Sequence, residues 1–285
     1  MGPDNQIENS ADITSSPTYL PVPQHLNGSD PIYKEIFHRY GLNEGLCFFG
    51  ALTMITSSIT RQGLPESFEQ IIATFTKYDE KHLTRAFDLL PVERRVQGFE
   101  ELPPFVTDEG VDGRYFKPYV VDYTLELLNA MFSQENIGIK IGYLKMYDLV
   151  RDITLREGAM EKLSRIARFS DTHRNMVERR VASSLMNIFA DYGRHQTGLI
   201  LPMKGKPLDG KGHVVAATGV AHIHGQEETL IIHDVVKRRE VLLPKLEVVR
   251  FFDIGGIYSL HPQEDQVFFE YSLPALLVSP AHIYQ

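Results

Sequence analysis

The stretch that decides the fold is GHVVAATGVAHIHGQEETLIIHDVV, residues 212–236. Two runs rich in β-branched and small apolar residues, 213–223 and 228–236, are joined by the polar turn HGQEE at 224–228, whose last residue also begins the second run. Such runs, separated by turn residues, predict two antiparallel strands joined by a hairpin. In such a pair the start of the first strand lies beside the end of the second. The stretch therefore predicts that His213 and Asp234 lie close together, although they are 21 positions apart in sequence.

The rest of the chain divides into a helical N-terminal half and a β-rich C-terminal third. Short apolar runs at 197–204 and 255–260 predict two more strands, and a β-like run occupies 137–144. Apolar residues at helical spacing predict helices; these cover 31–40, 47–60, 65–78, 79–90 and 121–133, with two or three more between 147 and 192. Helices followed by an antiparallel sheet predict an α+β fold.

The chain has 285 residues and a formal net charge of −8. Its length and composition predict a polar, flexible N-terminal arm at 1–30 and a single domain at 31–285, with an inserted helical block at about 64–195. The acidic balance argues against non-specific binding of nucleic acid. No apolar run is long enough to span a membrane, and the first residues lack the features of a signal peptide. We expect a cytoplasmic protein, or one exported without a cleavable signal peptide; the oligomeric state stays open.

The chain contains one cysteine, which excludes an intramolecular disulfide and a Cys/His zinc ribbon. Cys47 lies at the predicted first turn of an almost wholly apolar helix. Unpaired N–H groups at a helix start stabilise a thiolate, so this position predicts a lowered thiol pKa. The same N–H groups could stabilise an oxyanion on a carbonyl attacked by the sulfur. The alternative is that Cys47 is an inert core residue.

His213 and Asp234 provide the other two groups that thiol catalysis needs. An imidazole at the mouth of a strand can take the proton of a thiol and later return it to a leaving group. A carboxylate beside the imidazole fixes its tautomer and supports the imidazolium. Each residue alone could equally be a capping or surface polar group, but the combination with Cys47 favours a functional site.

The arrangement resembles the papain-like fold, in particular its C39-like peptidase branch in bacteria. The matching order begins with a strand and a loop, followed by a strand that starts at Gly-His. A turn, a strand that ends in Asp and a later strand complete it. The resemblance covers residues 198–260, and residues 41–60 match more loosely. The resemblance implies a helical lobe, with a buried nucleophile helix, packed on an antiparallel sheet. By position it implies that Cys47 is the nucleophile, His213 the general base and acid, and Asp234 the orienting residue.

The chain departs from the family pattern near the cysteine and the aspartate. Gly41 stands where the family usually has a Gln that contributes to the oxyanion hole, so Asn43 is the nearest amide and the substitute candidate. Phe48 follows the cysteine where the family tends to have Gly, and Val235 follows the aspartate where it tends to have Pro. The block at 64–195 would be an elaboration or a lid.

These groups predict a cysteine peptidase-like hydrolase that acts on a peptide or protein amide substrate, with no metal or organic cofactor. An acyltransferase, a transglutaminase or a deamidase would use the same triad. A binding or scaffold protein that keeps the fold without catalysis is the alternative from another class, and the missing Gln favours it.

A second kind of site also has to be considered. His222, His224 and His233 lie near Asp234, and two histidines one residue apart on a strand can share a metal ion. On a regular strand, however, His213 faces the other way, and the pair runs into the polar turn. Structural or solvated histidines are the favoured interpretation.

Overall fold

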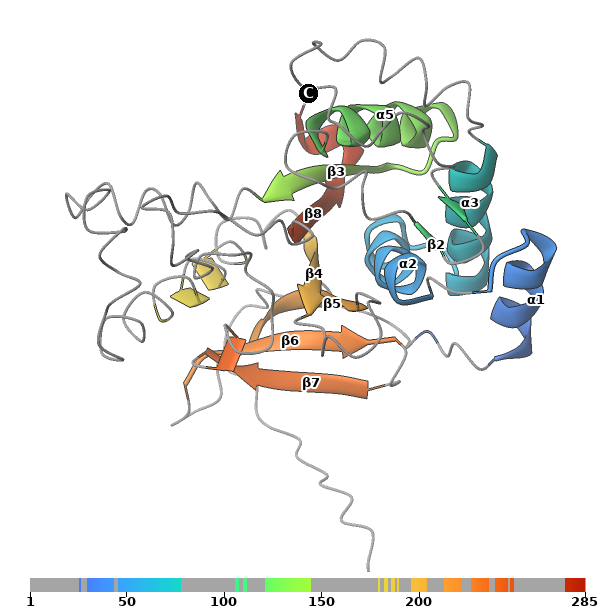
Figure 1. The fold of residues 1–285 in the computed structure, drawn as a ribbon. Coiled ribbons are helices and arrows are strands. Elements are labelled where there is room, and N and C mark those ends of the chain that lie inside the picture. Colours follow the sequence, from blue (N-terminus) through green and yellow to red (C-terminus); the bar gives the residue numbers. More distant parts are fainter. Residues whose placement is uncertain are drawn as a thin grey trace, which may run out of the picture.

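The structure is a computed structural model, shown in Figure 1. It describes the following residues: 26, 30–43, 46–77, 106–107, 110–111, 121–144, 179, 182–183, 186–187, 189, 196–203, 213–221, 227–235, 239–245, 247–248 and 275–284. Helices and an antiparallel sheet make up this part of the chain, as the α+β expectation required.

The main sheet has six strands in the order β3-β8-β4-β5-β6-β7, and every neighbouring pair is antiparallel. The strands are β3 (Ile139–Leu144), β4 (Gly198–Met203), β5 (His213–Ala221), β6 (Thr229–Asp234), β7 (Arg239–Pro244) and β8 (Ala275–Pro280). A separate two-stranded sheet joins β1 (Val106–Thr107) to β2 (Gly110–Val111). The sheet thus combines segments from distant parts of the chain.

The predicted strands at 137–144, 197–204, 213–223 and 228–236 are confirmed as β3, β4, β5 and β6. The strand expected at 255–260 lies outside the described residues. The sequence pattern did not predict β7 or β8. A charged run leads into β7, which is typical of a turn, and β8 is a short run buried at every position, without the alternation that distinguishes a strand.

The described helices are α1 (Pro31–Arg39), α2 (Leu46–Thr60), α3 (Leu64–Lys77) and α5 (Val121–Gln134), which confirms four of the predicted helices. Asp30 caps α1, because its carboxylate accepts a hydrogen bond from the Ile32 N–H at 3.1 Å. Arg61, with a φ of 60°, ends α2 in the left-handed region. The helix expected at 79–90 is outside the described residues, as are most of those expected between 147 and 192.

A first hydrophobic core lies between the helices and one face of the sheet. Aromatic rings from α1, α2, α3 and α5 meet in it; they include Phe37, Phe49, Phe68, Phe75 and Phe132. The sheet contributes alternate residues of its strands, such as Val214 and Ala216 of β5. α2 is therefore buried on almost every side, which explains its nearly uniform apolar sequence.

A second core covers the opposite face of the sheet. Val215 and Ala217 of β5 point into it, and the helical residues Ala182, Met186 and Phe189 pack there. Figure 1 shows α2 on one side of β4 and the short helical pieces around 182–189 (yellow) on the other. Both faces of the central strands are thus buried. Successive side chains of β5 alternate between the first core and the second core.

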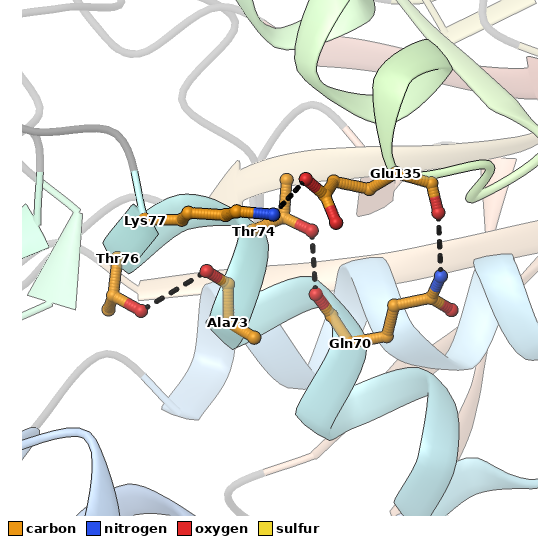
Figure 2. Close-up of polar contacts among 6 residues, drawn as sticks. All are labelled: Gln70, Ala73, Thr74, Thr76, Lys77 and Glu135. Carbon is orange, nitrogen blue, oxygen red and sulfur yellow. Dashed lines mark hydrogen bonds and ion pairs between the residues drawn. The ribbon is translucent and has the colours of Figure 1, made fainter.

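Polar contacts fasten α3 to the end of α5. Figure 2 shows Gln70 Nε2 donating a hydrogen bond to the Glu135 carbonyl at 3.0 Å, while Lys77 forms an ion pair with the Glu135 carboxylate. Since α3 and α5 share the core of α2, and β3 belongs to the main sheet, the described parts of 64–195 are integral to the fold. The expectation that the block at about 64–195 is an insertion, as an elaboration or a lid, stays a prediction.

Two residues of the predicted arm at 1–30 are described. Leu26 is buried in the first core, and Asp30 caps α1, so these two positions are docked on the domain. The remainder of the arm lies outside the described residues. None of the helices in the described part of the chain has the length and apolar character needed to cross a bilayer.

Candidate functional site

Cys47 is the second residue of α2, so the prediction that it stands in the first turn of a buried helix is confirmed. Its side chain is half-buried and packs against the first core. Three backbone N–H groups, those of Val214, Phe48 and Cys47 itself, interact with the sulfur and favour its ionised form. Two of them are the unpaired N–H groups of the helix start, and the third comes from β5.

Burial nevertheless raises the pKa of the Cys47 thiol, and the negative charge of Asp234 raises it further. The N–H groups of Val214, Phe48 and Cys47 act in the opposite direction and do not compensate. The expectation of a lowered pKa is therefore wrong. Its physical reason is that the start of α2 lies in the protein interior, where a charged sulfur loses its hydration.

His213 and Asp234 are brought together as predicted. His213 Nε2 lies 3.1 Å from Asp234 Oδ1, within hydrogen-bonding distance. The Asp234 side chain is 4% exposed, while that of His213 is 25% exposed, so the carboxylate is buried and the ring reaches solvent. The hairpin of β5 and β6 produces this contact, because His213 begins one strand and Asp234 ends the other.

The thiol and the imidazole approach the start of β5 from different sides. Val214 points into the first core with α2, whereas Met203, paired with His213, packs against the second. Because successive residues of a strand point to opposite faces, the His213 side chain leaves the sheet on the face away from α2. Among the described residues, no hydrogen bond joins Cys47 to His213. The imidazole and the carboxylate form a pair, and the negative charge of Asp234 also acts on the sulfur.

Asn43, the candidate oxyanion donor, is exposed in the short segment that follows α1. Residues 44 and 45, which connect it to α2, lie outside the described residues. The role of its amide stays a prediction.

His233 is a structural histidine of the sheet. It is 3% exposed, and its Nε2 lies 3.0 Å from the Thr218 hydroxyl, at the bulge where the pairing of β5 with β6 shifts register. Its Nδ1 lies 3.8 Å from a carboxylate oxygen of Glu240 on β7. The other two histidines considered for a metal site, His222 and His224, lie outside the described residues, and the described part of the chain contains no metal-binding cluster.

Sequence reasoning missed two features beside Cys47. The first is the Val214 N–H, which depends on how α2 docks on β5. The second is the tight packing of Gly50, one turn after Cys47, against Val235, directly after Asp234. A glycine inside an apolar helix is a signal of close packing, but the sequence does not name its partner. No family model matches the chain, and neither do the curated proteins or solved structures with which it was compared.

Proposed function

We propose that this chain is a thiol-dependent hydrolase of amide bonds, with Cys47 as nucleophile, His213 as general base and acid, and Asp234 as the residue that orients the imidazole. The observation that carries the proposal is the 3.1 Å contact between His213 Nε2 and Asp234 Oδ1. The Val214 N–H, one residue after His213, interacts with the sulfur. The sulfur and the imidazole thus flank the start of β5 from its two faces, and the proposed reaction requires the ring to turn toward the sulfur at the end of the strand, as in the papain-like peptidases that the sequence resembles.

The raised pKa of Cys47 defines the first step of the reaction. A neutral thiol has to lose its proton as it attacks, so His213 takes that proton while the sulfur bonds to the carbonyl carbon. Asp234 stabilises the imidazolium that results. Nε2 of His213 already contacts Asp234, so Nδ1 is the ring nitrogen left to take the thiol proton once the ring turns toward the sulfur.

The later steps return every group to its starting state. The tetrahedral oxyanion is stabilised by N–H groups at the start of α2 and by the amide of Asn43. When the carbon–nitrogen bond breaks, His213 gives its proton to the leaving amine, and a thioester on Cys47 remains. His213 then deprotonates water, which attacks the thioester and releases the acid and the thiol.

The test is hydrolysis of a mixture of fluorogenic peptidyl-coumarin amides by the full chain and its variants. Cys47→Ala should abolish turnover, and His213→Ala should reduce it by about 100-fold or more, because general acid–base catalysis contributes that much. Asp234→Asn should also reduce turnover, since the amide cannot support the imidazolium. Turnover by Cys47→Ala at the wild-type rate would contradict the proposal.

A second candidate function is binding without catalysis on the same fold. Two observations favour it: burial raises the pKa of the thiol, and no hydrogen bond joins Cys47 to His213 among the described residues. A peptide aldehyde separates the two functions, because it forms a reversible thiohemiacetal only where a nucleophilic sulfur and an accessible cleft coincide. A Cys47 adduct in wild type but not in His213→Ala supports the hydrolase, and equal or absent reaction in both supports the binding protein.

A further inference from the structure

Gly50 occupies a position where no side chain fits. A Cβ atom built there would lie 2.6 Å from Val235 Cγ1, and 3.2 Å from both Cβ and Cγ2 of the same residue. One of these atoms is the Cβ of a branched side chain, so rotation about χ1 cannot clear all three contacts. An added methyl group at position 50 therefore has to separate α2 from the end of β6.

The contact lies next to both halves of the proposed site. Gly50 and Cys47 are three residues apart on α2, so they share one face of the helix. Val235 directly follows Asp234 and is 3% exposed. The distance between helix and strand at this contact thus sets how closely the sulfur approaches Val214, Asp234 and the start of β5.

We propose that Gly50 is a positioning residue for the thiol site: its missing side chain lets α2 dock on Val235, which holds Cys47 against the start of β5 beside the His213–Asp234 pair. The proposal rests on the function proposed above for its catalytic consequence. Glycine inside a helix is less stable than alanine because its backbone loses more conformational freedom on folding, so its place in the buried α2 has to be compensated by packing. The contact with Val235 provides that packing.

A double-mutant cycle of Gly50→Ala and Val235→Ala tests the proposal. Because Cys47 is the single cysteine of the chain, iodoacetamide reports on it alone. Gly50→Ala should move the start of α2 outward, expose the sulfur and lower the pH midpoint of alkylation; a drop of half a unit speeds alkylation about threefold at pH 7.5. It should also lower kcat for amide hydrolysis. Adding Val235→Ala makes room for the new methyl group and should restore both quantities toward wild type.

Gly198→Ala is the matched control. A Cβ atom at Gly198 would lie 2.8 Å from Ile55 Cγ1, so this substitution also strains the contact between α2 and the sheet, but two turns beyond Cys47. It should lower the thermal melting temperature as Gly50→Ala does, while the pH midpoint of alkylation stays at the wild-type value. A merely structural role of Gly50 would give both variants the same alkylation behaviour.

Two results would overturn the proposal: a Gly50→Ala protein with the wild-type alkylation midpoint, or a double variant whose effects equal the sum of the single ones. If Gly50→Ala lacks a cooperative thermal transition, Val235→Ala alone decides, because it loosens the same contact and should speed alkylation of Cys47. Wild-type alkylation in that variant would also overturn the proposal. Absence of hydrolysis in the wild type would reject the proposed function. The alkylation rates of the double-mutant cycle would still test whether Gly50 positions Cys47.

Discussion

At Cys47, two effects of opposite sign act on one sulfur atom. Backbone N–H groups at the start of α2 and on β5 favour the thiolate, whereas burial and the charge of Asp234 favour the thiol. Burial is the largest of these, so the thiol pKa rises. A helix start activates a cysteine only where the sulfur keeps its hydration or gains enough donors to replace it. In the resting protein Cys47 is therefore a neutral thiol, and the proposed attack on an amide needs a base.

The pH dependence of Cys47 alkylation follows from the raised pKa of its thiol. Since the folded pKa lies above that of an ordinary thiol, the thiolate fraction at pH 7 is lower in the folded chain than in the unfolded chain. Each unit of increase slows iodoacetamide labelling about tenfold at neutral pH. Labelling should be slower in buffer than in urea at pH 7, and the difference should shrink as the pH rises through the folded pKa. Mass spectrometry measures both rates, and faster labelling of the folded chain would show that the thiol is activated.

At the scale of elements, Asn129 joins α5 to the edge strand β3. Its Nδ2 donates a hydrogen bond to the Ile141 carbonyl at 2.9 Å, and its Oδ1 accepts one from the Ile141 N–H at 2.7 Å. β3 is the first strand in the sheet order, with β8 on one side. The amide thus satisfies backbone groups that the sheet itself leaves open at this edge.

Replacement of Asn129 by alanine should destabilise the protein by about 1–3 kcal/mol, because it leaves partly buried backbone groups without partners. Urea unfolding followed by circular dichroism measures the change. Glu126→Ala, at an exposed position of the same helix, is the control and should change the free energy of unfolding by less than about 0.5 kcal/mol. Equal midpoints for the two variants would show that the Asn129 contacts contribute no stability.

At the scale of the whole molecule, β8 joins the edge strand β3 to the rest of the sheet. It pairs with β3 on one side and β4 on the other, although these strands lie far from it in sequence. Leu276 and Val278 point into the first core, whereas Ala275 and Leu277 point into the second. The C-terminal strand is thus part of both cores at once.

Deletion of residues 275–285 should therefore abolish cooperative unfolding, because it opens the sheet between β3 and β4 and removes apolar side chains from both cores. Deletion of 282–285 alone keeps β8 and should leave a cooperative transition near the wild-type midpoint. Thermal unfolding followed by circular dichroism distinguishes the two. A cooperative transition in the longer deletion would mean that β3 and its helices fold without the strand.

The sequence by itself determined the local elements of this protein and one contact between them. Apolar spacing predicted α1, α2, α3 and α5, and the hairpin of β5 and β6 predicted the contact of His213 with Asp234. These predictions succeed because each depends on residues close in sequence. The helices follow from the spacing of apolar residues, and the hairpin follows from two apolar runs separated by a short polar turn.

The tertiary structure alone decided the rest. The pairing of β8 with β3 and β4 has no local signal, because it joins distant segments through backbone groups that every sequence possesses. The raised pKa of Cys47 likewise depends on what covers the start of α2, namely β5 and the end of β6, which no pattern within the helix specifies. Burial depends on contacts between segments that are remote in sequence. The helix start alone supported a lowered pKa of the Cys47 thiol, and burial raises that pKa instead.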